Sequence, residues 1–157
     1  MPIEPADFRQ TLGRFPTGVT VVTFAQPGGG VHGITVSSFT SLSLTPPLVG
    51  VAIGRKARAH GMLAGLQRYG VSILADGQAS VSDHFAGRPV ALPDDPFEKL
   101  EAFPVLVGAA AQLVCDVVDQ VDVGDHTLVV GRIEAIRLYP VGSLAYGEGR
   151  YGRVQSD

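Results

Sequence analysis

The chain has 157 residues, of which 45% are hydrophobic and 17% charged, and its formal net charge is −3 at pH 7. This composition is typical of a globular domain with enough apolar side chains for a core, and it excludes disordered and fibrous chains. The charge balance predicts no general attraction for nucleic acid or for an anionic membrane surface. No stretch has the length of an apolar membrane span, and no signal peptide is expected. The single cysteine, Cys115, favours a reduced, cytoplasmic setting.

Glycine and proline residues divide the chain into short segments rich in Val, Ile, Leu, Thr and Phe, which is typical of β-strands. Strands are predicted over residues 19–24, 33–37, 48–53, 69–74, 110–118 and 127–138. Apolar side chains recur at helical spacing in three other segments, residues 5–14, 59–67 and 79–86. Six strands suffice for a small barrel, so the expected fold is mainly β with a few peripheral helices.

The segment 87–108 contains four prolines and four acidic residues. It is too proline-rich and polar for a central strand, so we expect a partly mobile surface excursion. No repeat, low-complexity tract or shift in composition divides the chain, and residues 1–157 are therefore expected to form one domain.

The sequence Gly28-Gly29-Gly30-Val31-His32-Gly33 matches the G-x-G-x-x-G pattern of dinucleotide-binding Rossmann units. Such a unit continues with a helix and carries an acidic residue about 20 positions later. Here a β-branched run with poor helix propensity follows instead, over residues 34–40. The glycines are therefore interpreted as a hairpin turn.

The stretch 37–47 is unusually dense in hydroxyl side chains and ends in Pro46-Pro47, which forces an extended exit. It is interpreted either as a hydrated sheet edge or as a ledge of small residues. In the second case its hydroxyl and backbone groups lie against a flat heterocycle that forms hydrogen bonds.

The densest basic cluster is Arg55-Lys56-Ala57-Arg58-Ala59-His60, between a predicted strand and a predicted helix. Cations are unfavourable at a helix N-terminus unless an anion binds there, and a phosphate is the natural candidate. A solvated basic turn is the alternative.

Four histidines occur without the spacing of a metal site, so no metal is expected. His126 follows Asp125 at the start of a long apolar strand, where it either caps the strand or has a catalytic or cofactor role. No hydrolase, Walker or kinase motif is present, and Cys115 is interpreted as a packed hydrophobe. A small β-barrel with a hydroxyl-rich ledge and a basic cluster of a size to hold a phosphate favours a protein whose chemistry is supplied by a bound cofactor.

Two segments, 15–23 and 32–47, resemble the short-chain NAD(P)H:flavin oxidoreductases, the flavin reductase-like family with an FMN-binding split barrel. Later segments agree with this family in order and spacing, namely 69–74, 84–87, 124–126 and 146–151. Within the family, the amino-acid sequences of residues 58–60 and 125–128 are most similar to those of the reductase components of styrene monooxygenases.

This resemblance implies a six-stranded antiparallel Greek-key split barrel that works as a homodimer. It implies that NADH or NADPH reduces FMN or FAD by hydride transfer to flavin N5, and that a separate, transiently bound oxygenase receives the reduced flavin. Two alternatives stay open on the same barrel. One is another flavoprotein, such as a pyridoxal-phosphate oxidase-like enzyme or a bound-flavin redox protein, and the other is a non-catalytic binding module.

The resemblance also implies roles for individual residues. The ledge under the flavin ring is matched by Thr35, Val36, Ser37 and Ser38, with Ser43 and Pro47 behind it. Phosphate contacts are matched by Lys56, Ala57, Arg58 and Ala59, and by His84, Phe85 and Ala86. The nicotinamide side is matched by the candidate catalytic residue His126 and by Arg150 and Tyr151. Many relatives carry Ser, Thr or Asn in the phosphate turn, where this chain has Ala57, Arg58 and Ala59, so phosphate binding is expected to depend on Arg58 and backbone amides.

Overall fold

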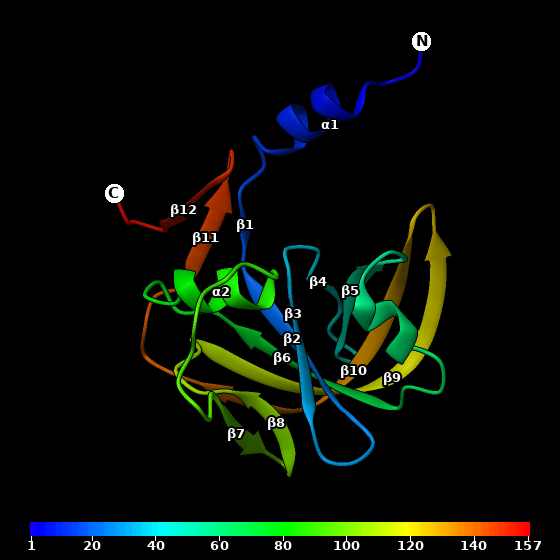
Figure 1. Cartoon of the computed structure of the whole chain (residues 1–157), viewed down its shortest axis with the longest axis vertical. Coiled ribbons are helices and arrows are strands. Elements are labelled where there is room, and N and C mark those ends of the chain that lie inside the picture. Colours follow the sequence, from blue (N-terminus) through cyan, green and yellow to red (C-terminus); the bar gives the residue numbers. More distant parts are fainter.

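The computed structural model describes residues 1–157 and contains twelve β-strands, two short α-helices and one 3-10 helix (Figure 1). A seven-stranded antiparallel sheet has the order β3-β2-β6-β9-β10-β5-β4. Its strands are β2 (Thr20–Ala25), β3 (Val31–Val36), β4 (Thr40–Ser43), β5 (Leu48–Gly54), β6 (Arg68–Ile73), β9 (Ala111–Val123) and β10 (His126–Leu138). The predicted mainly β, antiparallel fold is thus confirmed.

The predicted number of six strands is wrong, because the stretch 40–43 also pairs, along β5, with Thr40 opposite Gly50. Two smaller antiparallel sheets were not predicted. One contains β1 (Thr17–Gly18), β11 (Leu144–Gly147) and β12 (Arg150–Arg153), and the other contains β7 (Phe97–Leu100) and β8 (Phe103–Leu106). Their segments are too short, too polar or too rich in glycine and proline to show a strand pattern.

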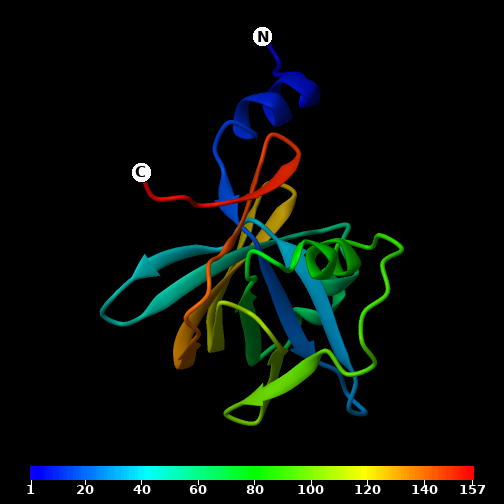
Figure 2. The ribbon, with the colours of Figure 1, turned by 90° about the vertical axis from the view of Figure 1, so that its left-hand side faces the viewer.

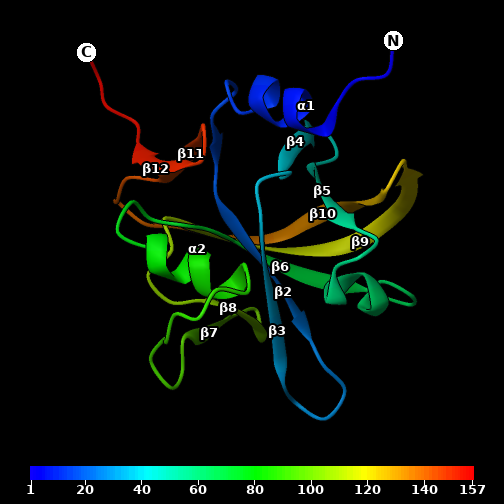
Figure 3. The ribbon, with the colours of Figure 1, turned by 45° about the horizontal axis from the view of Figure 1, so that its top comes forward.

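The main sheet curls, so that β3 at one end of the order comes into contact with β5 near the other end (Figure 3). Alternate residues of each strand point inward, as period-two geometry requires. They form the largest core cluster, which contains Val22, Phe24, Val51, Ile53, Tyr69, Val71, Leu113, Cys115 and Val129. Burial raises the pKa of the Cys115 thiol to about 12, so this cysteine is a packed side chain and not a nucleophile.

The predicted helix over 59–67 is shorter than expected and is the 3-10 helix η1 (Arg58–Met62). Buried Ala59, together with Leu63 just after η1, joins the core cluster, so this segment plugs one end of the curled sheet. The other two predicted helices are confirmed with shorter bounds, as α1 (Pro5–Leu12) and α2 (Ala79–Phe85). Neither α-helix is long and apolar enough to cross a membrane.

Helix α2 packs closely on β3. The Phe85 ring lies so near Gly33 that a Cβ at that glycine would fall 2.6 Å from it. Phe85 and Val81 also pack against a second core cluster, made of Val19, Val21, Leu74, Leu106 and Leu144. The close approach permitted by Gly33 sets the start of α2 beside the end of β3.

The interpretation of segment 87–108 as a surface excursion is corrected by the β7–β8 hairpin. Leu100 and Val105 are buried against Val114 of β9. The Thr23 hydroxyl of β2 donates a 2.6 Å hydrogen bond to the carbonyl of Pro104. The hairpin therefore covers the sheet, and Pro104 is tolerated because β8 is an edge strand.

Candidate functional site

A small cavity of about 150 Å³ opens between the end of β3, helix α2 and the β11–β12 hairpin. Its polar lining residues are Thr35, Ser37, Ser82, Arg88, Tyr146 and Tyr151, and Ala86 and Val19 complete it. These elements meet because α2 lies on β3 and because β11 pairs with β1, which leads directly into β2. The cavity is thus a polar opening in the wall of the sheet.

A chain of hydrogen bonds fixes this lining. The Thr35 hydroxyl donates to the Ser82 carbonyl at 2.7 Å, and the Tyr151 hydroxyl donates to Asp83 Oδ1 at 2.7 Å. Because the Tyr151 proton is used on Asp83, the Ser82 hydroxyl is the donor in its 2.8 Å bond to Tyr151. Arg88 binds the same Asp83 oxygen at 2.9 Å.

Tyr151 is held as a neutral phenol. Partial burial and the Asp83 carboxylate raise the pKa of this tyrosine above its usual value. Its ring lies 5.3 Å from that of Tyr146, centroid to centroid. The two rings give the cavity an aromatic wall with a fixed hydroxyl.

The predicted ledge residues divide into two groups. Thr35 and Ser37 line the cavity, whereas the Val36 side chain is buried in the core and its carbonyl accepts from Thr20 at 2.9 Å. The Ser38 hydroxyl donates to the Ala52 carbonyl at 2.8 Å and accepts from the Ala52 N–H at 3.1 Å. Ser38 therefore fastens the end of β3 to β5.

Ser43 and Pro47 lie beyond the cavity, in the β4–β5 hairpin. Ser43 pairs with Leu48, and the Pro47 carbonyl accepts a 2.9 Å bond from the Ile133 N–H. Figure 2 shows this hairpin projecting from the rest of the sheet. The structure places both residues in this hairpin and not among the residues that line the cavity.

The predicted phosphate turn joins β5 to η1. Lys56 and Arg58 are exposed there and form no ion pair within the chain, whereas Arg55 pairs with Asp122 at 3.4 Å. Ala59 is fully buried, and the Ala57 N–H donates to the Gly54 carbonyl at 3.0 Å. Of the four predicted residues, only Lys56 and Arg58 offer charged side chains to an anion.

The charge of Arg58 reaches the start of β3. Burial is the main cause of a lowered pKa at His32, and the nearby guanidinium of Arg58 lowers it further. His32 also stacks on Phe24, with ring centroids 6.4 Å apart. The 3-10 helix η1, which begins at Arg58, also contacts β3, the strand whose other end lines the cavity.

His126 lies beside the same turn, because it is the partner of Gly54 where β10 pairs with β5. Its Nδ1 forms a 2.7 Å hydrogen bond with Asp125 Oδ1, and this bond lowers the pKa of Asp125. In the neutral ring, Nδ1 carries the proton and Nε2 is left as an acceptor. His126 is half exposed, so Nε2 is available to a ligand.

A second hydrogen-bonded chain, which the sequence did not predict, holds the turn against β10. The Thr127 hydroxyl donates to Asp122 Oδ1 at 3.1 Å and accepts from His60 Nε2 at 2.8 Å. Since Asp122 also pairs with Arg55, this carboxylate is tied to both ends of the cluster 55–60.

Replacing Thr127 by Val is expected to raise the KM for flavin about threefold, because the substitution removes both bonds of this chain while keeping the side-chain shape. Steady-state kinetics at saturating NADH measure the change. Thr127→Ser, which keeps the hydroxyl, is the matched control and should stay near the parent value. Equal kinetics for Thr127→Val and the parent protein would show that this chain does not position the turn.

The other predicted site residues lie on α2 and on the β11–β12 hairpin. His84 Nδ1 bonds the Val90 carbonyl, and its ring packs edge-on against Phe85 at 4.8 Å. These two side chains hold α2 in place, while Ala86 faces the cavity. Arg150 is 81% exposed on the β11–β12 hairpin.

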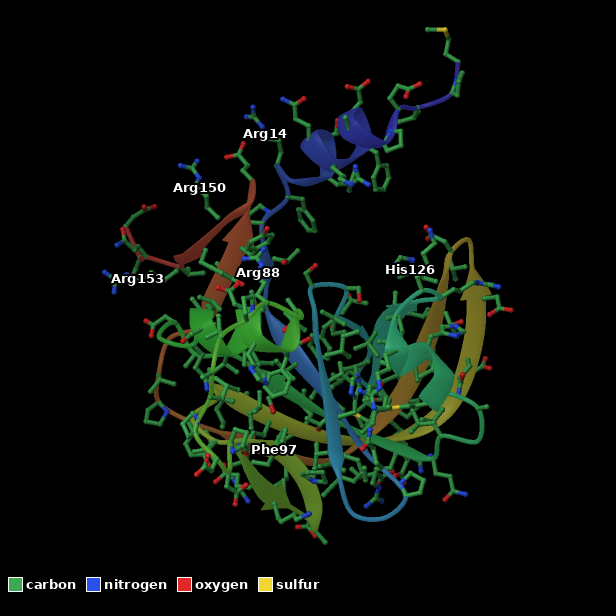
Figure 4. All side chains as sticks on the ribbon, viewed as in Figure 1. Arg14, Arg88, Phe97, His126, Arg150 and Arg153 are labelled. Carbon is green, nitrogen blue, oxygen red and sulfur yellow. The ribbon has the colours of Figure 1, made fainter.

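Figure 4 shows that the side chains of Arg150 and His126 lie apart from each other within the chain. Arg88 and Arg150 lie on one side of the β3–β4 connection and His126 lies on the other. Of the three residues predicted on the nicotinamide side, His126 and Arg150 thus lie on opposite sides of the β3–β4 connection, and Tyr151 lines the cavity. Sequence reasoning missed Ser82, Asp83 and Arg88. The only signal was their position next to the matched segment 84–87.

Comparison with known proteins identifies the family. The sequence model described as flavin reductase like domain matches residues 12–155. An NADH-dependent flavin reductase from a Rhodococcus species is 43% identical over 136 residues, covering 85% of this chain and 77% of that protein. The structure of the styrene monooxygenase flavin reductase from Pseudomonas putida S12 superposes with a TM-score of 0.88 at 36% identity, covering 96% of this chain and 99% of that one.

A further solved structure is the NADH:FAD oxidoreductase of Streptomyces globisporus in complex with NAD and FAD fragments. It superposes with a TM-score of 0.89 at 33% identity and covers 100% of this chain and 98% of that one. The resemblance seen in the sequence is confirmed by these matches, including its likeness to styrene monooxygenase reductases. The chain belongs to the flavin reductase-like domain family.

Proposed function

We propose that this protein reduces FMN or FAD with NADH or NADPH and supplies the reduced flavin to a separate oxygenase component. The observation that carries the proposal is that one strand, β3, lines a cavity with hydroxyl side chains at its end and also contacts the 3-10 helix η1, at whose start the unpaired cation Arg58 lies. A flavin nucleotide has the matching chemistry, a flat ring that forms hydrogen bonds and a phosphate at the end of a flexible ribityl chain. The names of the Rhodococcus and Streptomyces relatives support the same activity.

The residues present fit a flavin nucleotide. Thr35 and Ser37 bring small side chains and backbone groups to the cavity. Lys56 and Arg58 supply positive charge and form no ion pair within the chain. When bound, flavin supplies the N5 atom that accepts a hydride from nicotinamide C4.

The chain's own task is positioning. Hydride transfer needs no proton to be removed from the donor carbon, so no general base is obligatory. His126, with Nδ1 held by Asp125, presents Nε2 at a defined orientation to the nicotinamide carboxamide or ring. Backbone N–H groups near the end of β3 stabilise the negative charge that develops near flavin N1 and the C2 carbonyl.

The simplest test mixes the protein with NADH and free flavin in air and follows NADH absorbance. Turnover that rises with added FMN or FAD is the expected result, because the flavin is a substrate that leaves reduced. A rate independent of added flavin would instead indicate a bound-flavin redox protein, and no NADH oxidation would indicate a binding module.

We further propose that residues 1–157 form a single Greek-key split-barrel domain that works as a homodimer in the cytoplasm. Helix α1 supports the dimer, because it has no buried residue and projects away from the sheets (Figures 1 and 2). Its Phe8 and Leu12, and Phe15 after it, are exposed apolar side chains of the kind that an interface covers.

Light scattering at micromolar concentration is expected to give the mass of two chains. Phe8→Glu should shift the mass toward one chain, because it places a charge in the proposed interface. Arg9→Glu, at the neighbouring position of the same helix, is the matched control and should leave the dimer intact. A monomeric parent protein that still reduces flavin would contradict the dimer proposal.

A further inference from the structure

The cavity at the end of β3, here called the small cavity, has little room for a flat ring. Its volume is about 150 Å³, whereas small-molecule sites measure about 300 to 1,000 Å³. A large cavity of about 500 Å³ lies beside it, between the segment that follows α1 and the β11–β12 hairpin. Tyr146 and Tyr151 line both cavities. Their rings therefore form a partition, and the small cavity gains room when this partition moves.

The two tyrosines of the partition are held differently. The Tyr151 hydroxyl bonds Ser82 at 2.8 Å and Asp83 at 2.7 Å, which fixes its ring on α2. The Tyr146 hydroxyl forms no hydrogen bond within the chain. Its ring is held only by packing against the second core cluster and against Tyr151. Rotation of the Tyr146 side chain to another rotamer breaks no hydrogen bond, so Tyr146 is the movable half of the partition.

A buried hydroxyl lies beside the Tyr146 ring. Thr17 of β1 is directly opposite Tyr146 of β11, and residues paired in this way place their side chains on the same face with Cβ atoms about 5 Å apart. Figure 1 shows the two strands side by side. The Thr17 hydroxyl is the one buried side-chain polar group that has no hydrogen bond within the chain. Such a group lowers the stability of the folded protein unless it finds a partner.

Thr17 lines neither cavity, although its neighbours do. Pro16, which precedes it, lines the large cavity, and Val19, two residues further along, lines the small one. Tyr146, its partner across the strands, lines both. The unpaired hydroxyl thus lies at the junction of the two cavities, on the face that the movable ring occupies.

We propose that rotation of the Tyr146 ring joins the two cavities and uncovers Thr17, whose hydroxyl then donates a hydrogen bond to a carbonyl oxygen of the flavin ring. This inference rests on the proposed flavin reductase activity. The flavin ring has the matching chemistry, because it carries carbonyl acceptors and is proposed to lie beside Thr35 and Ser37, which line the small cavity. Thr17 is then a binding residue in the flavin-loaded protein and an unpaired group in the free protein.

Replacing Thr17 by Val, which keeps the shape and removes the hydroxyl, is expected to have two opposite effects. The melting temperature of the flavin-free protein should rise by about 3 °C, because an unpaired buried hydroxyl is lost. The dissociation constant for FMN, measured by fluorescence quenching without NADH, should rise about fivefold, because the bound ring loses a donor. Thr17→Ser keeps the hydroxyl and should bind FMN as the parent protein does.

Thr20→Val is the matched control for stability. The Thr20 hydroxyl is also buried on a neighbouring strand, but it donates to the Val36 carbonyl at 2.9 Å. The same substitution should therefore lower the melting temperature there. Opposite signs at the two threonines separate the loss of an unpaired hydroxyl from a general effect of valine in a strand.

Stopped-flow fluorescence tests the movable ring. Tyr146→Ala removes it, so FMN is expected to associate about fivefold faster, because the open state no longer has to form before binding. Tyr146→Phe keeps the ring and loses only an unbonded hydroxyl, so it should associate at the parent rate. Unchanged association in Tyr146→Ala would overturn the movable partition. If that variant does not fold, the two Thr17→Val measurements decide the proposal.

Parent-like FMN affinity in Thr17→Val, or a lowered melting temperature, would overturn the role of Thr17. A raised KM for NADH with unchanged FMN affinity would assign the hydroxyl to the other reactant and would also overturn it. Failure of the parent protein to oxidise NADH with any flavin would instead refute the proposed function, and FMN binding to the Thr17 variants would still decide this inference.

Discussion

His126→Ala is expected to slow hydride transfer from NADH to flavin by about a hundredfold, the loss typical of a substrate displaced by about 1 Å from its reactive position. The imidazole stands at the start of β10 next to Gly54, and its Nδ1 is held by Asp125 at 2.7 Å. Removing it takes away the group that orients the nicotinamide. The affinity for oxidised flavin should stay unchanged, because the charges of Lys56 and Arg58 are untouched. Stopped-flow absorbance measures hydride transfer, and fluorescence quenching measures flavin binding.

Two further variants separate positioning from folding. Asp125→Asn is expected to give an intermediate loss, because an amide still reaches Nδ1 but no longer carries the charge that favours its proton. Asp119→Asn, at an exposed position of β9, is the matched control and should behave as the parent protein. A lowered melting temperature with unaltered hydride transfer in His126→Ala would show that the histidine only caps the strand.

Local sequence patterns predicted those strands whose inner faces are apolar. Val49, Val51 and Ile53 alternate with smaller residues along β5, and this alternation alone places the strand. Strand β4 has no such face, since three of its four residues are exposed. It is a strand because β5 offers a free edge, and that edge exists only after the sheet has formed. Non-local pairing of this kind leaves no local signal.

The sequence could predict those residues of the candidate site that lie within one continuous segment. Thr35 and Ser37 both line the cavity, and both belong to one matched stretch, while their contact with a flavin ring stays a prediction. Ser82 joins them through a bond to Thr35 that spans 47 positions and a bond to Tyr151 that spans 69. In the sequence, a serine in a short helix such as α2 cannot be distinguished from a solvent-exposed serine. The contacts that fix the site arise from the close packing of α2 on Gly33, which no sequence pattern of α2 records.

The structure removes the helix N-terminus from which anion binding at the turn 55–60 was predicted. The sequence predicted a helix N-terminus as the reason for anion binding, but η1 is a 3-10 helix of five residues. So short an element contributes little dipole. Side-chain charge is therefore the remaining reason to expect an anion at the turn. Arg55 is already bound to Asp122, which leaves Lys56 and Arg58 as the unpaired cations. Flavin phosphate binding should therefore be sensitive to the loss of a single guanidinium.

Arg58→Ala is accordingly expected to raise the KM for FMN by about tenfold, equivalent to about 1.4 kcal/mol of binding free energy. Riboflavin, which has the same ring and ribityl chain without the phosphate, should be reduced with nearly the parent KM. Arg58→Lys keeps the charge but not the forked geometry and should lie between the two. Arg132→Ala, on β10 and paired with Glu134, is the matched control for the loss of a surface arginine. Equal losses for riboflavin and FMN would show that Arg58 acts through the shape of the turn and not as a phosphate ligand.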